Sequence, residues 1–190
     1  EPYRRQRQMC IRDRVQLILS PGQGWTDVAA TRLPYRELAA SGLYPLTALT
    51  ALSVFISRIY HEGLTLGHLL TGAVITFVMY FLGYFISTFV MSVFLKPHVD
   101  EGEMSEERYH TFVIYIIGLL EIITIIQNCL PTAIAITLFL PIYVAIVMWK
   151  GARYMRIRRD HTGPFMILNV LGVLLPPYIL SFLFHLILPV

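Results

Sequence analysis

One carboxyl group stands in the middle of an apolar stretch of the chain. Glu121 is the only ionisable side chain deep inside any of the long apolar runs. A charge at mid-membrane costs roughly 2.5 to 3.5 kcal/mol on insertion scales, so such residues usually have a partner or a function. We expect Glu121 to face other helices, with Tyr143 and Tyr178 as candidate partners and Tyr115 as a further intramembrane polar group. A hydrogen bond that fixes helix register and an ion or proton relay or gate are both open.

A group of basic residues follows the fourth apolar run. Bases beside a membrane helix are typical of a surface that holds anionic lipid, or they serve orientation alone. A third interpretation is that the acidic loop, residues 96–109, folds against this group, because both lie on the same predicted side. The basic residues are Lys150, Arg153, Arg156, Arg158 and Arg159.

Carboxylates and imidazoles occur close together at two places. Glu107 and His110 are one helical turn apart, and His61, Glu62 and His68 form a second group. A metal site needs more ligands than one such pair supplies, so we predict neither a metal site nor a cofactor. Zinc-protease, nucleophile-elbow, phosphate-loop and Cys-x-x-Cys patterns do not occur in the sequence. We therefore expect no catalytic residues and a protein that is not an enzyme.

The elements that must position these groups are apolar helices. The chain of 190 residues is 56% hydrophobic and only 14% charged, against about 25% charged in soluble domains. Crossing roughly 30 Å of hydrocarbon takes about 20 apolar residues in a helix. We predict an all-α polytopic membrane bundle with five transmembrane helices at residues 39–57, 67–95, 110–129, 130–149 and 165–188, with a tight hairpin at Pro131 and an interruption at Pro176-Pro177.

Two segments precede the predicted membrane domain, residues 39–188. Residues 1–14 are polar and basic and resemble translated adapter sequence, so we interpret them as a non-native or disordered tail. Residues 15–38 alternate apolar and polar groups around a Pro21-Gly22 break. This lead-in either lies on the membrane surface, with Trp25 at the level of the lipid headgroups and facing lipid or a partner, or is a plain linker before the first span.

The basic residues predict the orientation. Alternate connecting segments place 14 Lys and Arg residues on one side and one, Arg58, on the other. The positive-inside rule then puts the N-terminus in the cytoplasm and the C-terminus outside. Without residues 1–14 the ratio is 9 to 1, so the orientation is the same.

Several features together resemble the prokaryotic branch of the Yip domain family, the Ypt/Rab GTPase-interacting proteins. They are the lead-in Pro21-Gly-Gln-Gly-Trp25, the five runs, Phe112 and Tyr115 in the third run, Pro131 at the hairpin, the stretch from Tyr143 to Gly151, and prolines in the last run. The resemblance covers roughly residues 15–188 and implies a five-span bundle with a cytoplasmic N-terminus. In eukaryotic members it implies binding of prenylated Rab-type GTPases. The chain lacks the long Pro/Gln/Gly-rich tail and the Asp-Leu-Tyr-Gly-Pro type motif, so the GTPase-binding role is not carried over.

These observations favour a Yip-type membrane adaptor or scaffold over a soluble protein. We expect it in the inner (cell) membrane of a prokaryote, with a cytoplasmic face that meets a protein partner or anionic lipid. The alternative is a small transporter or channel component that uses Glu121. We expect no nucleic-acid partner, because the basic residues cluster beside apolar runs. Homo-oligomer formation is left open.

Overall fold

The structure, a computed structural model, describes residues 17, 20–30, 33–60, 63, 65–99, 105–130 and 139–188. Within these ranges the chain is helical and contains no strand, apart from an isolated bridge between Val99 and Ile157. The elements are α2 (Pro21–Ala30), α3 (Tyr35–Leu38), η1 (Ala39–Leu43), α4 (Tyr44–Ser53), η2 (Val54–Ile59), α5 (Leu66–Phe94), η3 (Lys96–His98), α6 (Glu106–Cys129), α7 (Leu140–Gly151), η5 (Arg159–His161), α8 (Thr162–Asn169), η6 (Val170–Leu174) and α9 (Leu175–Ile187). The prediction of an all-helical protein with apolar spans is confirmed for this part of the chain.

Four helical stretches among these residues are long and apolar enough to cross a membrane. They are Tyr35–Ile59, Leu66–Phe94, Glu106–Cys129 and Arg159–Ile187. The predicted fourth span, residues 130–149, is represented by α7, whose 12 residues rise only roughly 18 Å at 1.5 Å per residue. Pro131 and the rest of residues 131–138 lie outside the described residues, as does the predicted tail. Five spans are therefore not confirmed.

Two of these stretches contain π-helical turns just before a proline. η1 precedes Pro45, and η6 precedes Pro176 and Pro177. Proline has no N–H to donate and its ring crowds the preceding turn, so a widened turn lets the helix continue past it. The expected interruption at Pro176-Pro177 is thus a local π turn within a continuous helical stretch.

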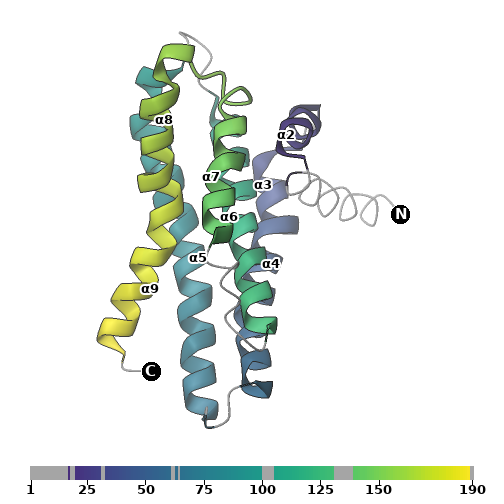
Figure 1. Cartoon of the computed structure of the whole chain (residues 1–190), viewed down its shortest axis with the longest axis vertical. Helices are drawn as coiled ribbons and strands as arrows, with labels where there is room; N and C mark the ends of the chain where they lie inside the picture. The colour runs from purple at the N-terminus through teal and green to yellow at the C-terminus, as the bar shows by residue number, and fades with distance from the viewer. Residues whose placement is uncertain are drawn as a thin grey trace.

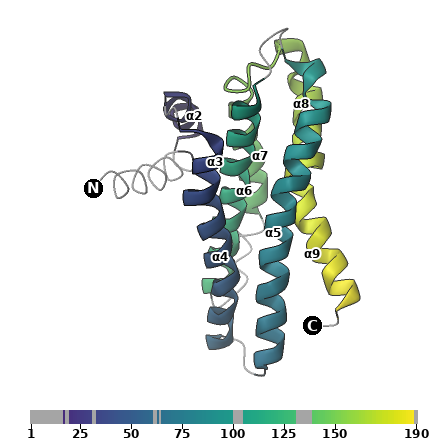
Figure 2. The same ribbon diagram turned by 180° about the vertical axis from the view of Figure 1, so that it is seen from behind.

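Helix α6 forms the centre of the bundle (Figures 1 and 2). Its side chains from Thr111 to Glu121 are all buried. Helices α4, α5 and α7 contact it, and α9 packs along α5. In both views α2 lies at one end of the bundle and the last turn of α9 lies at the other. We call the first of these the α2 end.

Helix α2 is held in the α2 end by one aromatic side chain. The Trp25 indole stacks between the rings of Phe112 and Tyr154, with centroids 5.1 Å from each, and its Nε1–H donates to the Val147 carbonyl at 2.9 Å. Gly151 allows this approach, because a Cβ there would lie 2.6 Å from Phe112. Trp25 is only 3% exposed. The expectation that Trp25 lies at the lipid surface is therefore wrong, because an indole sandwiched by two rings is buried within the protein.

The two connections at the α2 end contact each other. The Arg158 backbone N–H donates to the His98 carbonyl at 3.2 Å, and the Arg158 guanidinium donates to the Pro97 carbonyl at 3.0 Å. The first part of the acidic loop thus packs against the basic segment through backbone carbonyls. The acids Asp100, Glu101 and Glu103 lie outside the described residues.

Candidate functional site

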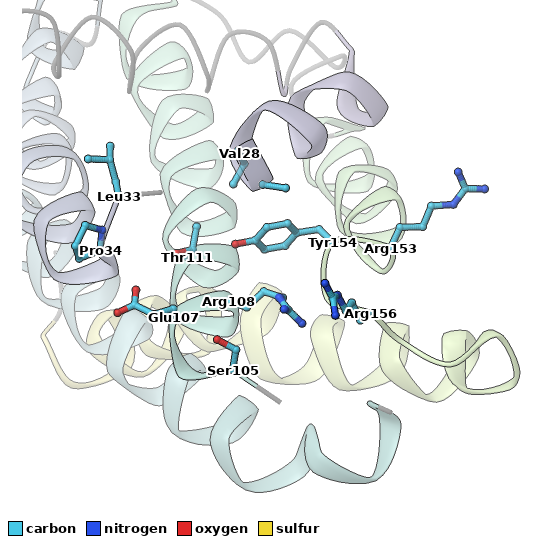
Figure 3. A pocket seen from close by; sticks show the side chains of 11 residues that line it. Val28, Leu33, Pro34, Ser105, Glu107, Arg108, Thr111, Arg153, Tyr154 and Arg156 are labelled. Atoms are coloured by element: carbon cyan, nitrogen blue, oxygen red, sulfur yellow. The ribbon is translucent and has the colours of Figure 1, made fainter. Parts of the chain in front are cut away.

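A cleft of about 510 Å³ opens at the α2 end (Figure 3). It lies between α2, the segment leading into α3, the first turns of α6 and the segment after α7. The lining mixes apolar and charged side chains. The lining residues are Val28, Ala29, Leu33, Pro34, Ser105, Glu107, Arg108, Thr111, Arg153, Tyr154 and Arg156.

Tyr154 forms a fixed wall of the cleft. Its ring stacks on Trp25, and its hydroxyl points toward Thr111, to which it is hydrogen bonded. Burial raises the pKa of Tyr154, and the Thr111 hydrogen bond offsets part of that rise. The phenol is therefore a neutral group held in one orientation by its two neighbours.

The carboxylate of the cleft is already engaged. Glu107 Oε2 accepts the Tyr35 backbone N–H at 2.8 Å, and Glu106 Oε1 accepts the Tyr35 hydroxyl at 3.0 Å. An unpaired N–H at the start of a helix favours an anionic acceptor, so Glu107 caps α3. One oxygen of the Glu107 carboxylate is therefore occupied by the backbone N–H at the start of α3.

Three arginines give the cleft its positive charge, against the single Glu107. Arg108 and Arg156 both line the cleft, whereas the end of the Arg153 side chain turns away from it in Figure 3. Arg156 is also the one non-glycine residue with positive φ in the described ranges, at 52°. Its backbone is in the left-handed region that favours glycine.

The structure divides the predicted basic surface into separate groups. Arg153 and Arg156 line the cleft, whereas Lys150 and Arg159 are not part of its lining, and all four residues are exposed. Arg158 holds the two connections together. Sequence reasoning missed Arg108, Thr111 and Tyr154 as cleft residues. The available signal was that Arg108 and Thr111 are three apart at the start of a helix, and so share a face.

The predicted carboxylate–imidazole pair is built differently from a metal site. The His110 ring stacks on Tyr35 at 4.1 Å, and its Nδ1 lies 2.9 Å from the Tyr84 hydroxyl. Glu107 is turned to the α3 terminus instead. Among the described residues no group of three His, Cys, Asp or Glu side chains is placed to hold a metal, and His61 and Glu62 are outside them.

Glu121 is the second candidate site, in the middle of α6. It is fully buried, and its Oε1 is hydrogen bonded to the Thr47 hydroxyl of α4. Thr47 also donates to the Leu43 carbonyl at 3.0 Å. Sequence reasoning expected Glu121 to face other helices but did not name Thr47.

The other predicted polar residues of the membrane lie at different depths of burial. Tyr115 is buried and meets Trp25 edge-on, with ring centroids 6.2 Å apart. Tyr143 is half-buried on α7, and Tyr178 on α9 is 42% exposed. They are therefore distributed over three helices rather than gathered at one point.

A line of polar side chains continues from Glu121 along α4 and α6, away from the α2 end. The Asn128 amide donates to the Ser53 hydroxyl at 2.8 Å. Thr124 shares a hydrogen bond with the Tyr80 hydroxyl at 2.6 Å. In an apolar bundle such contacts fix the rotation of one helix against its neighbour.

The two sites, the cleft and Glu121, are described here by their geometry. Comparison with family models, with curated proteins and with solved structures gives no match to this chain. The resemblance to the Yip domain family has no support from these comparisons and stays a prediction.

Proposed function

We propose that this chain is an integral membrane adaptor or scaffold that binds an anionic partner at its α2 end. The observation that carries this proposal is the cleft lined by Arg108, Arg153 and Arg156. Arginine guanidinium groups present planar sets of donors that match phosphate and carboxylate oxygens. Glu107, the carboxylate among the lining residues, accepts the Tyr35 backbone N–H, and three arginines of the lining accompany it.

The wider distribution of charge supports the same end of the molecule as the binding face. Most Lys and Arg residues of the described chain are at the α2 end, and Arg58 follows α4 at the opposite end. By the positive-inside rule the α2 end is cytoplasmic and the end of α9 is outside. The proposed location is the inner membrane of a prokaryote.

The experiment is affinity capture of the full chain from native membranes in mild detergent, with bound proteins and lipids identified and counted. We expect a near-stoichiometric anionic lipid or acidic protein with the wild type, and its loss when Arg108, Arg153 and Arg156 are all changed to Gln. The control variant, Arg58→Gln, removes one charge at the opposite end. An identical set of partners from wild type and triple variant would refute the proposal.

A second candidate function uses Glu121. The polar line along α4 and α6 favours a small transporter or channel component, in which Glu121 acts as a relay or gate for an ion or proton. A buried ionisable group inside a bundle is typical of such pathways. The same line serves equally as packing between α4 and α6, and the Glu121 and Thr47 variants described in the Discussion separate these roles.

A further inference from the structure

We infer that the contact between α4 and α6 is a proton path, which opens at the end of the molecule opposite α2 and ends at Glu121. This inference rests on the second candidate function, in which Glu121 acts as a relay, and adds the ion and the side from which it arrives. We call the path the polar seam. Its residues are Thr47, Thr50, Ser53 and Ser57 on α4 and η2, and Glu121, Thr124 and Asn128 on α6.

The residues of the polar seam recur at helical spacing on two facing helices. They are three or four positions apart in each helix, and side chains at that spacing share one face. Hydrogen bonds join the two faces at two points, Thr47 with Glu121 Oε1 and the Asn128 amide with the Ser53 hydroxyl. Thr50 lies between these points on α4 and is fully buried, so it belongs to the same contact.

The hydroxyls of α4 present oxygen lone pairs to the seam. Each donates to a carbonyl of the preceding turn, at 3.0 Å for Thr47, 2.8 Å for Thr50 and 2.6 Å for Ser53. A hydroxyl that has donated its proton still accepts, so water can donate to each of these oxygens. Neighbours on a helix face are roughly 5 to 6 Å apart, about the length of two hydrogen bonds, so one water between successive hydroxyls completes a chain.

The polar seam lies on one side of Glu121. Toward the α2 end η1 contacts α6, and the buried side chains there are apolar, among them Leu43 and Ala39 of η1 and Ile114 and Ile117 of α6. This half shows that the helices pack together through apolar groups, whereas a polar group inside a membrane is costly. The placement of the hydroxyls in the other half therefore indicates access to Glu121 from that side.

The polar seam reaches the surface at the end opposite α2, toward which α4 and α6 run together (Figures 1 and 2). Burial decreases along it. Thr50 and Ser53 are buried, Ser57 and Asn128 are half-buried, and the adjacent Gln127 is exposed. By the positive-inside rule this end faces the outside. The proton therefore enters from the outside and not from the cytoplasm.

The chemical step is a reversible proton transfer to water. The protonated Glu121 carboxyl gives its proton to a water of the seam, which becomes hydronium and leaves a carboxylate, and the proton then passes from water to water toward Ser57. The reverse sequence reloads the carboxyl. Thr47 compensates the new charge, because its hydroxyl can turn from the Leu43 carbonyl to donate to the carboxylate.

The test measures from which side a polar reagent reaches the seam. In the full chain with both native cysteines changed to Ser, Thr50→Cys is treated with a small charged methanethiosulfonate reagent, from the outside in intact cells and from the cytoplasmic side in inverted vesicles. We expect reaction from the outside only. Two controls should react from neither side. They are Leu49→Cys, whose side chain is 54% exposed on the apolar outer surface of α4, and Ile117→Cys, on the α2 side of Glu121.

A matched pair of variants tests the hydroxyls themselves. Ser53→Thr and Ser53→Val add side chains of nearly equal size, but only threonine keeps the hydroxyl. In the Thr50→Cys protein, Ser53→Val should abolish reaction from the outside, and Ser53→Thr should retain it. A water-soluble carbodiimide, which adds to protonated carboxyls, makes the same comparison at Glu121. Its modification from the outside, measured by mass spectrometry with Glu121→Gln as the blank, should be lost in Ser53→Val alone.

The outcomes separate this inference from the second candidate function. Reaction of Thr50→Cys from the cytoplasmic side, reaction from neither side, or equal reaction in Ser53→Val and Ser53→Thr would overturn the path. One-sided access in a protein without any pH-dependent flux would support the path and remove only the transport candidate. Flux in a protein whose seam is reached from both sides would retain the transport candidate and overturn the inference.

Discussion

At the scale of single residues, the Thr47 hydroxyl is shared between two hydrogen-bond partners. The Thr47 hydroxyl has one proton and two acceptors beside it, the Leu43 carbonyl and Glu121 Oε1. Both contacts are full hydrogen bonds when Glu121 is the neutral acid and donates to Thr47, which in turn donates to Leu43. A neutral carboxyl is also the form that an apolar bundle accommodates at least cost.

We predict that Glu121→Gln folds with a stability within about 1 kcal/mol of the wild type, because the amide can also donate to Thr47. Thr47→Val conserves shape but removes the hydroxyl, and should lower the free energy of unfolding by about 1 to 3 kcal/mol. Both values are measured by denaturation in detergent micelles. An unchanged free energy of unfolding in Thr47→Val would show that this hydrogen bond does not stabilise the bundle.

The same variant distinguishes the two functions proposed for Glu121. If Glu121 only holds α4 against α6, a correctly folded Glu121→Gln protein behaves as the wild type in reconstituted liposomes. If it relays protons, the folded variant loses a pH-dependent flux that the wild type shows. A wild type without any flux removes the transport candidate.

At the scale of elements, two histidines join the connection after α5 to the start of α8. The Arg158 guanidinium Nη2 lies 2.7 Å from His161 Nε2, and His161 Nδ1 lies 3.0 Å from His98 Nδ1. Because arginine only donates, His161 Nε2 is the acceptor and its proton is on Nδ1, directed at His98. This arrangement requires an unprotonated His98 Nδ1. Desolvation, followed by the nearby His161 and Arg158, lowers the pKa of His98.

We predict that acid weakens this junction. The folded state binds a proton at His98 less readily than the unfolded state does, so stability is greatest above the ordinary histidine pKa of about 6.5 and falls as the pH drops through it. Unfolding midpoints of the full chain at about pH 8 and about pH 5 measure the effect. His98→Asn, whose amide oxygen can accept from His161 without titrating, should show a smaller drop. Asp160, whose carboxylate lies 3.5 Å from His161 Nε2, is unchanged in that variant. If the unfolding midpoints of the wild type and His98→Asn fall equally between the two pH values, another group is responsible for the pH dependence.

At the scale of the whole molecule, the direction of the helices decides how the chain crosses the membrane. Helix α6 runs from the α2 end to the opposite end, and α8 begins again at the α2 end (Figures 1 and 2). The end of α6 and the start of α8 therefore lie at opposite ends of the bundle, and α7, the helix described between them, is by itself too short to span it. The number of membrane crossings depends on the chain between α6 and α8.

Single cysteines can test this topology. In a background with Cys10 and Cys129 changed to Ser, we predict that Gln23→Cys and Arg159→Cys are labelled from the cytoplasmic side and Tyr60→Cys from the outside. All three positions are exposed. The measurement is labelling of intact cells and inverted vesicles with a membrane-impermeant thiol reagent. Labelling of Arg159→Cys and Gln23→Cys from opposite sides would show that residues 130–151 do not complete a crossing.

The sequence by itself determined the class of protein and the approximate place of its helices. Hydropathy and helix length are local properties, so the run at residues 67–95 could be recognised without its neighbours, and the structure has a helix at Leu66–Phe94. The same reasoning identified Glu121 as a group that needs a partner. The structure of residues 130–149 was harder to predict, because an apolar run of this kind can form either a membrane span or a shorter buried helix.

Tertiary structure alone decided which side chains meet. The burial of Trp25 depends on Phe112 and Tyr154, which are far away in the chain, and on Gly151 leaving room for the indole. The pairing of Thr47 with Glu121 depends on how α4 is rotated against α6. Arg108 and Arg156 line the same cleft only because the start of α6 lies beside the segment after α7 at the α2 end. The rotation of each helix and its docking against its neighbours are set by packing between distant segments. The hydropathy of the sequence does not predict them.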